Sequence, residues 1–301
     1  MLGGESMVTK LDLYKIFFYV GKNKSISKAA KELFMTQPAV SQAIMQIERE
    51  LETQLFHRMP RGVRLTQEGE HLFEYIQSAM HFIEAGEEKL LEFKGMTVGE
   101  LKIGVGDTIS RYFLLPFLEH FHSRYPKIKL KIINGTTFEI CSSLKERELD
   151  IAFCNFPLED PMLDMRPCMD VHDVFVCGDK FRFLLNRPIA LKELLDIPLI
   201  TLESKANSRK YMEAFLLSKG IEISPEFELG SHDLLLEFAR INLGVACVTR
   251  EFSMEYIEKG LLYEIELQEN IPKRSIGVCY VKDVPLLPAS IKFLEIVHKG
   301  K

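Results

Sequence analysis

Residues 25–51 read SISKAAKELFMTQPAVSQAIMQIEREL and predict a short helix, a turn and a second helix. Ser25 or Ser27 can cap the first helix and Thr36 the second, because their hydroxyls accept otherwise unpaired backbone N–H groups. Pro38 falls in the first turn of the second helix, where a missing N–H costs nothing. Apolar residues at helical spacing predict the buried face of the second helix. These residues are Val40, Ile44, Ile47 and Leu51.

The opposite face of the second helix carries short side chains that are mostly uncharged donors and acceptors. They are Gln37, Ser41, Gln42, Met45 and Gln46. Such side chains suit hydrogen bonding to base edges in the major groove of DNA. The simpler interpretation is an amphipathic helical hairpin with a solvated polar face. The pattern favours a helix-turn-helix whose second helix is the recognition helix.

Residues 57–66 predict a two-stranded wing with its turn at Pro60-Arg61-Gly62. Arg58, Arg61 and Arg64 are placed there to contact backbone phosphate or the minor groove, and a solvated hairpin is the alternative. Residues 8–66 hold ten lysines and arginines against five acidic residues, whereas the whole chain has a net charge of −5. A basic N-terminal segment in an otherwise acidic chain is typical of a protein that contacts phosphate groups through that segment.

This order of residues resembles the N-terminal signature of the LysR-type transcriptional regulators, most clearly over residues 10–95. The matching segments are Ser27-Lys28-Ala29-Ala30, Leu33, Thr36-Gln37-Pro38-Ala39-Val40-Ser41, Ile47-Glu48, Leu55-Phe56-His57-Arg58, Val63-Arg64-Leu65-Thr66 and Gly69. The resemblance implies a winged helix-turn-helix DNA-binding domain over residues 8–66. The DNA-binding residues that we predict are Ser27, Thr36, Gln37, Pro38, Ser41, Gln42, Met45, Gln46, Arg58, Arg61 and Arg64.

Residues 67–93 predict one long helix whose apolar residues alternate four and three apart, which is the pattern of a coiled coil. The seam consists of Leu72, Ile76, Ala79, Ile83, Gly86, Leu90 and Phe93. A second copy of the helix is the obvious partner, and the alternative is a helix packed on its own body. The resemblance implies a linker and dimerisation helix over residues 67–96, with a flexible hinge at 95–99. Two subunits can then read two half-sites.

Residues 97–301 alternate strands with helices, which predicts an α/β domain with a parallel sheet. Strands are expected at 101–106, 128–133, 149–154, 174–177, 199–201, 245–248 and 275–281. Helices are expected at 112–125, 138–147, 208–219, 232–242 and 287–297. The resemblance implies two lobes, as in periplasmic binding proteins, with chain crossings near 162–170 and 270–274. Lobe I then covers about 97–165 and 274–301, and lobe II about 166–273.

A cleft between such lobes should be lined by the carboxyl ends of strands and the N-termini of helices, which favour anions. Three segments qualify, at 106–110, 135–137 and 204–208. They match the positions where the family binds small, usually anionic effectors. The effector-binding residues that we predict are Thr108, Ser110, Thr136, Ser204, Asn207 and Ser208, with Lys205 and Arg209 as possible countercharges. The alternative role for Thr108, Ser110 and Asn207 is plain helix capping.

The composition describes an ordinary globular protein, with 47% hydrophobic and 27% charged residues. No apolar run is long enough to cross a bilayer and no signal-peptide pattern opens the chain, so we expect a cytoplasmic protein. The six scattered cysteines are expected to be reduced core residues, and a redox switch at Cys168 or Cys177 is disfavoured. The histidines show no metal-ligand spacing, and no acid–base or nucleophile constellation is present. We therefore expect no metal, no cofactor and no enzymatic activity.

These observations predict a ligand-responsive transcription factor whose partners are double-stranded promoter DNA, a small anionic metabolite and RNA polymerase. We expect it to form a dimer or a dimer of dimers and not to bind membranes. The rival hypothesis is a small-molecule-binding protein or enzyme whose N-terminal helices merely dimerise it.

Overall fold

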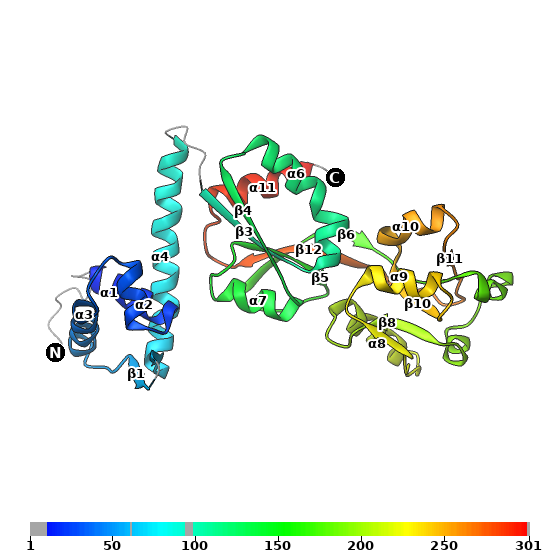
Figure 1. Ribbon diagram of the computed structural model, residues 1–301, viewed down its shortest axis with the longest axis horizontal. Helices are drawn as coiled ribbons and strands as arrows, with labels where there is room; N and C mark the ends of the chain where they lie inside the picture. The colour runs from blue at the N-terminus through cyan, green and yellow to red at the C-terminus, as the bar shows by residue number, and fades with distance from the viewer. Residues whose placement is uncertain (1–10, 61, 94–98, 300–301) are drawn as a thin grey trace. The chain divides into compact units, whose positions relative to one another are not determined.

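The computed structural model describes residues 11–60, 62–93 and 99–299, and it divides into two compact units between Leu90 and Leu91. The first unit holds three short helices, a small hairpin and most of a long helix (Figure 1). The second unit holds two five-stranded sheets with their helices. Arg61 and nearly all of the predicted hinge at 95–99 lie outside the described residues.

The first unit begins with α1 (Leu11–Asn23), α2 (Ile26–Glu32) and α3 (Gln37–Glu50). Ser25 caps α2 by accepting from the backbone N–H of Lys28, and Thr36 caps α3 by accepting from that of Ala39, so both predicted caps are confirmed. The inner face of α3 is buried as the periodicity predicted, with Leu51 partly buried at the helix end. Its buried residues are Val40, Ala43, Ile44 and Ile47.

The wing consists of β1 (Phe56–Met59) and β2 (Gly62–Leu65), paired antiparallel. Its first strand is tied to the recognition helix by Glu48. One carboxylate oxygen of Glu48 accepts from the backbone N–H groups of Leu55, at 2.8 Å, and Phe56, at 3.0 Å. Two hydrogen bonds to one charged acceptor fix where the wing leaves α3.

Gly62 anchors the other strand of the wing to the turn between α1 and α2. Its φ is +98°, and a Cβ at this position would lie 2.5 Å from the carbonyl oxygen of Lys24. The backbone N–H of Val63 donates to that same oxygen at 3.1 Å. Only glycine combines this conformation with such a close approach, so the turn chemistry predicted at 60–62 also holds the wing in place.

The long helix α4 spans Gln67–Phe93, as predicted. Its first part packs on its own unit, because Leu72 and Ile76 lie against the core formed by α1–α3 and the wing. Further along, the large apolar side chains are exposed to solvent. The exposed large apolar residues of α4 are Tyr75, Phe82, Ile83, Leu90 and Leu91. Part of the predicted seam therefore packs against the first unit, and the rest is exposed to solvent.

The first sheet of the second unit has the order β4-β3-β5-β12-β6. Its strands are β3 (Gly99–Val105), β4 (Ile128–Asn134), β5 (Ile151–Phe156), β6 (Leu163–Val171) and β12 (Arg274–Val281). The second sheet has the order β11-β7-β10-β8-β9. Its strands are β7 (Asp173–Cys177), β8 (Leu199–Leu202), β9 (Phe227–Leu229), β10 (Val245–Thr249) and β11 (Tyr263–Glu264). Both sheets are mixed rather than parallel, because β12 and β7 run antiparallel to their neighbours.

Helices cover both sheets, which gives the two α/β lobes that were expected (Figure 1). The helices of lobe I are α5 (Asp107–Ile109), α6 (Leu115–Arg124), α7 (Thr137–Lys145) and α11 (Pro288–Lys299). Those of lobe II are α8 (Asn207–Ser218), α9 (His232–Arg240) and α10 (Arg250–Glu258), with 3₁₀ turns at Asp179–Asn186 and Leu191–Asp196. The single helix predicted at 112–125 instead begins at Asp107 and contains a π-helical turn, Ser110–Leu114, just before Pro116. A proline removes one helical N–H, which fits the irregular turn.

The first crossing between the lobes lies later in the chain than predicted. Residues 163–171 form β6, which pairs with β12 from Leu163 opposite Val281 to Val171 opposite Arg274. Lobe I therefore continues to Val171, and the chain crosses directly into β7 at Asp173 rather than within 162–170. Pro167 concealed this strand, but β6 is an edge strand, where proline is tolerated.

The six cysteines carry free thiols, and five of them are buried. The buried ones are Cys141, Cys154, Cys168, Cys177 and Cys279, which agrees with the prediction that they are reduced core residues. Among the described helices, none combines the length and the apolar character that crossing a membrane requires.

Candidate DNA interface and effector site

The outer face of α3 is a polar surface that begins at the first turn of the helix. Thr36, Gln37 and Pro38 are exposed, as are Gln42 and Met45 one to two turns later. Ser41 and Gln46 are partly exposed. Because the inner face is packed into the core, this surface is presented on a rigid helix.

Two of the predicted base-reading glutamines differ in their surroundings. The hydroxyl of Ser27, on α2, donates to Oε1 of Gln37 at 3.1 Å and so holds the Gln37 side chain at the start of α3. The amide of Gln46 donates to Oε1 of Glu50 at 2.8 Å, within the last turns of the helix. Gln37 is therefore fixed at the accessible end, whereas Gln46 is already engaged along the helix.

The described wing arginines project from opposite faces of the hairpin. Arg58 faces Val63 across the hairpin, and Arg64 faces His57. Paired residues lie on the same face and neighbouring residues of a strand on opposite faces, so Arg58 and Arg64 lie on different faces. Arg58 and Ser41 line the same surface hollow, so Arg58 lies on the side of the recognition helix. Both guanidinium groups are exposed, and within residues 11–60 and 62–93 neither has a carboxylate partner. Exposed cations of this kind suit phosphate contacts.

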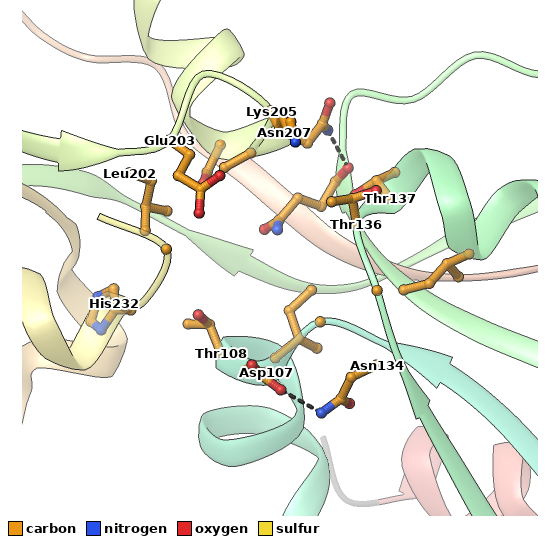
Figure 2. A pocket seen from close by; sticks show the side chains of 18 of the residues that line it. Asp107, Thr108, Asn134, Thr136, Thr137, Leu202, Glu203, Lys205, Asn207 and His232 are labelled. Atoms are coloured by element: carbon orange, nitrogen blue, oxygen red, sulfur yellow. Dashed lines mark hydrogen bonds between the residues drawn. The ribbon is translucent and has the colours of Figure 1, made fainter. Parts of the chain in front are cut away.

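The second unit contains a cavity of about 400 Å³ between its two lobes. Figure 2 shows Leu202, Glu203 and His232 on one side of this cavity and Thr136 and Thr137 on the other. The walls come from the segments that follow β3 and β4 in lobe I, and from those that follow β8, β9 and β10 in lobe II. These are carboxyl ends of strands, which is where open α/β sheets bind ligands.

Four of the six predicted effector residues line the cavity, and two do not. Thr108, Thr136, Asn207 and Ser208 lie in its wall. Ser110 instead starts the π-helical turn, and Ser204 is exposed in the turn before α8, so neither is part of the wall. All three predicted segments contribute residues to the cavity wall, but the rule that selected them did not resolve which residues of each turn face inward.

Among the four predicted effector residues in the wall, Thr136 and Asn207 have side-chain partners within the chain. Thr136 is the N-cap of α7: its hydroxyl donates to Oε2 of Glu139 at 2.8 Å and accepts from the Glu139 N–H at 3.4 Å. Asn207 is the first residue of α8 rather than its cap. Its amide donates to the backbone oxygens of Asn155, at 2.7 Å, and Pro157, at 3.2 Å, and so joins the two lobes.

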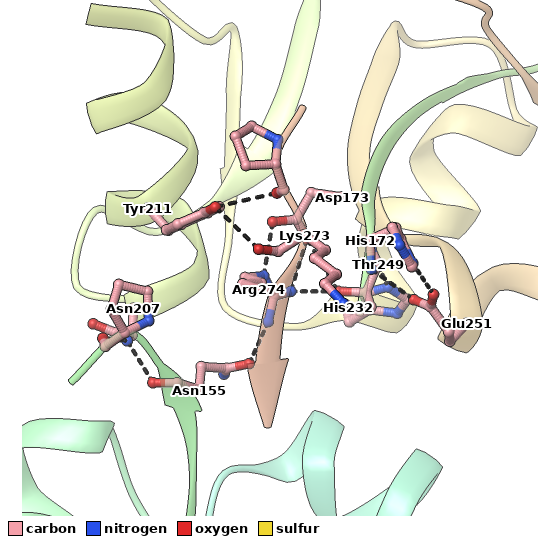
Figure 3. A network of polar contacts seen from close by, with 12 residues as sticks. Asn155, His172, Asp173, Asn207, Tyr211, His232, Thr249, Glu251, Lys273 and Arg274 are labelled. Atoms are coloured by element: carbon pink, nitrogen blue, oxygen red, sulfur yellow. Dashed lines mark hydrogen bonds and ion pairs between the residues drawn. The ribbon is translucent and has the colours of Figure 1, made fainter. Parts of the chain in front are cut away.

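Arg274 lies at the back of the cavity, in a buried network that the sequence did not reveal (Figure 3). Its Nε and Nη2 donate to the two carboxylate oxygens of Asp173, both at 2.7 Å. Its Nη2 also reaches Oγ1 of Thr249 at 2.7 Å, and its Nη1 reaches Oδ1 of Asn155 at 2.5 Å. Arg274 and Asn155 belong to lobe I, whereas Asp173 and Thr249 belong to lobe II, so the network spans both crossings.

The two predicted countercharges have different positions. Lys205 is exposed and lines the cavity. Arg209 is buried and points into lobe II, where it pairs with Glu213 at 2.6 Å and donates to the carbonyl oxygen of Leu202 at 3.0 Å. Arg209 is therefore a structural cation of lobe II, and it is not part of the cavity wall. Three carboxylates also line the cavity, those of Asp107, Glu139 and Glu203.

His232 supplies a buried hydrogen-bond donor in the cavity wall. The side chain of His232 is almost fully buried, and its Nε2 accepts from the backbone N–H of Thr249 at 3.3 Å. Burial lowers the pKa of His232 to about 4, so the ring is neutral and its one proton sits on Nδ1. Within the part of the chain that the structure describes, this buried Nδ1 has no partner. It is a buried donor whose hydrogen-bonding capacity is unused.

Two helices of lobe II begin at the cavity without a side-chain cap. The N-cap of α8 is Ala206, and that of α9 is Ser231, whose hydroxyl makes no capping hydrogen bond. Unpaired N–H groups and the helix dipole make such ends favourable for anions. His232 follows a strand end and opens a predicted helix, so the same sequence rule would have found it if β9 had been recognised.

Comparison with known families agrees with this architecture. A family model described as the bacterial regulatory helix-turn-helix protein of the lysR family matches residues 11–70. A second, described as the LysR substrate binding domain, matches residues 94–300. Together these two models match most of the chain.

Individual relatives match over most of their length. The regulator YofA of Bacillus velezensis is 28% identical over 282 residues, which is 93% of this chain and 95% of that protein. The regulator CysL of Bacillus subtilis is 25% identical over 239 residues, or 79% and 80% of the two chains. Among solved structures, full-length OxyR of Pseudomonas aeruginosa has a TM-score of 0.75 at 19% identity, covering 96% of this chain and 95% of that one. CrgA of Neisseria meningitidis has a TM-score of 0.55 at 23% identity, covering 97% of each.

The structural likenesses show the fold, and the two family models show the family. The chain belongs to the LysR family: it is a transcriptional regulator, not an enzyme, with an N-terminal DNA-binding domain and a C-terminal domain that binds a small-molecule effector.

Proposed function

We propose that α3 enters the major groove of promoter DNA with its first two turns facing the base edges. Gln37, Ser41, Gln42 and Met45 then read bases, while Ser27, Thr36 and the wing arginines contact the phosphate backbone. The observation that carries this proposal is the exposed, uncharged start of α3 on a helix whose other face is buried. Pro38 supports the same role because its fixed φ preorganises the first turn of α3.

Selection from a random duplex library tests this proposal. The full chain is expected to enrich duplexes with two related half-sites separated by one or more helical turns. Replacing Gln37 by Ala should remove the enrichment. Replacing Gln268, a glutamine of the second unit that donates to the Pro188 oxygen, should leave it unchanged. Enrichment of duplexes that contain only one half-site would contradict binding by two recognition helices at once.

We further propose that the chain acts in the cytoplasm as a dimer, and as a dimer of dimers on promoter DNA, in contact with RNA polymerase. The exposed apolar side chains of α4 support pairing with a second copy. In a heptad that starts from the predicted seam, Tyr75 and Phe82 fall beside the seam positions Ile76 and Ile83. Apolar residues at flanking positions widen the surface that pairing would bury.

For the effector, we propose a small anionic metabolite bound in the 400 Å³ cavity. Its negative group would meet the uncapped starts of α8 and α9, with Lys205 as a countercharge. A carboxylate fits these partners because it can accept from several N–H groups at once. Thr108 and Ser208 would hydrogen-bond the remainder of the molecule.

Effector binding would then change how far the lobes close, and with it the arrangement of the DNA-binding domains. An effector does this only if it binds one arrangement more tightly than the other. Asn207 and the Arg274–Asp173 pair both join the lobes at the cavity, so a bound ligand would lie beside the contacts that connect them.

A thermal-shift screen of carboxylate metabolites on the full chain tests the effector proposal. A ligand at about one hundred times its Kd stabilises a protein by about 2.7 kcal/mol, which for a domain of this size raises the Tm by about 5–10 °C. We expect Lys205→Ala to weaken the shift and Lys210→Ala, a lysine outside the cavity wall, to preserve it. A hit whose shift is the same in both variants would place the ligand elsewhere.

A further inference from the structure

Phe34 is an almost fully exposed aromatic residue beside the recognition helix. It lies in the turn between α2 and α3, and its side chain is 97% exposed. The predicted DNA-binding residues do not include it, and it belongs to no core cluster of the first unit. An aromatic ring left in water gains none of the stabilisation that burial provides.

The backbone of Phe34 makes this choice of residue more unusual. Its φ is +54°, in the left-handed region. The Phe34 N–H donates to the Lys31 oxygen at 3.2 Å, and the Met35 N–H donates to the Ala30 oxygen at 2.9 Å. This pattern closes the end of α2 and is usually built with glycine or asparagine, because a Cβ is disfavoured there. Folding therefore favours a smaller residue, and neither packing nor the turn explains a phenylalanine.

The surroundings of Phe34 point to DNA. It precedes Thr36, the cap of α3, by two residues, and Gln37 follows. In a helix-turn-helix the first helix crosses the backbone and the start of the second reaches the bases, so the turn between them lies close to the duplex. Lys31 on α2 is exposed nearby, whereas Glu32 is engaged by Asn23 at 2.6 Å. An exposed lysine such as Lys31 suits a phosphate contact beside an apolar one.

We propose that Phe34 contacts an apolar group of the bound duplex, either a thymine methyl group or a deoxyribose, next to the bases that Gln37 reads. Phenylalanine against the thymine methyl is a known form of direct readout, and a sugar offers the same apolar chemistry without sequence information. The Ser27–Gln37 hydrogen bond holds α2 and α3 together at this turn, so the ring is presented on a fixed frame. This inference rests on the DNA-binding function of the first unit and not on the effector proposal.

The test compares Phe34→Asn and Phe34→Gly with the wild-type chain. Both substitutions suit the left-handed conformation, so the Tm is expected to stay the same or rise. Affinity is measured by fluorescence anisotropy, at one salt concentration, on the duplex that the wild-type chain selects most strongly. We expect about a tenfold loss of affinity in both variants. Phe138→Asn, which removes another exposed ring in the second unit, should bind like the wild type.

A second arm identifies the group that the ring touches. Thymines of the selected duplex are replaced one at a time by deoxyuridine, which lacks only the methyl group. If one replacement weakens wild-type binding but not Phe34→Asn binding, the partner is that methyl group. If no replacement does so while Phe34→Asn still loses affinity on selected and random-sequence duplexes alike, the partner is a deoxyribose.

Two outcomes would overturn the proposal. Wild-type affinity of Phe34→Asn and Phe34→Gly on the selected duplex would show that the ring does not contact DNA. A loss of affinity accompanied by a smaller oligomer in light scattering would assign the ring to an interface between copies. Failure of the wild-type chain to select any duplex would instead contradict DNA binding by the first unit. The Phe34 contact would then be contradicted as well.

Discussion

Arg274 and Asp173 form a buried, two-pronged ion pair at the place where the chain crosses between the lobes. Both hydrogen bonds are 2.7 Å long, and the two side chains are 2% and 5% exposed. Arg274 opens β12 in lobe I, and Asp173 opens β7 in lobe II. The pair therefore ties the two lobes together at their crossing, and its Arg274 member lies in the cavity wall.

Breaking this pair should destabilise the second unit strongly. Arg274→Met leaves the Asp173 carboxylate buried without its partner, which costs about 3–5 kcal/mol in comparable cases. We expect a correspondingly lower Tm for the full chain in thermal unfolding. The double variant Arg274→Met with Asp173→Leu should recover much of the loss, because no buried charge is left unpaired. A single variant as stable as the wild type would contradict the role of the pair.

His232 should make stability fall at mildly acidic pH. Its pKa is about 4 in the folded chain and about 6.5 in an unfolded one, so below pH 6.5 the unfolded state binds more protons. The stability that the neutral ring contributes is fully present above pH 6.5 and is lost as the pH falls toward 4. Between pH 7.5 and 5 this amounts to about 2 kcal/mol.

The comparison that isolates this effect is His232→Gln, which cannot titrate and can still accept from the Thr249 N–H. We expect its Tm to fall less than that of the wild type between pH 7.5 and 5, by about 4–8 °C. Parallel losses in both proteins would mean that other groups, such as the ion-paired carboxylates, carry the pH dependence.

The wing should contribute to the salt dependence of DNA binding through Arg58. Each phosphate contact adds about one to the slope of log affinity against log salt, so Arg58→Ala should lower that slope by about one per subunit. Arg64 projects from the other face of the hairpin, and its removal should have a smaller effect. Titrations at several salt concentrations measure this, with Lys127→Ala in the second unit as the control. An unchanged slope for Arg58→Ala would remove Arg58 from the interface.

The open face of α4 should hold two copies of the chain together. Ile83 is a predicted seam residue and is exposed, so Ile83→Asp would place a charge in the paired interface. We expect a smaller oligomer by light scattering and weaker DNA binding. Ala85→Asp adds the same charge to the helix away from the seam and should change neither. Equal effects of both variants would indicate helix destabilisation rather than lost pairing.

Features encoded by neighbouring residues could be predicted from the sequence. The caps at Ser25 and Thr36 and the buried face of α3 follow from spacing within one helix, and the structure confirms them. The helix α4 and most of the strands were found for the same reason. Each of these signals lies within a few residues of the element that it defines.

Features that depend on residues far apart in the chain could not be predicted. Residues 163–171 carry no clear local strand signal and include Pro167, and only the pairing of β6 with β12 shows that they form an edge strand. Arg274 finds Asp173 about a hundred residues away, and no local pattern marks either as buried. Arg209 was predicted to face the cavity, but its side chain turns inward to Glu213 and Thr201. Position along a helix start does not determine which side of that start faces the ligand.

The most direct test of base reading by α3 is the ratio of affinities for the selected duplex and for a random-sequence duplex of the same length. The ratio is measured at one salt concentration for the wild-type chain and for the double variant Gln37→Ala, Gln42→Ala. We expect the ratio to fall close to one in the variant, while weak, salt-sensitive binding persists through the phosphate contacts. A ratio equal to that of the wild type would contradict the central claim that this face of α3 reads the DNA sequence.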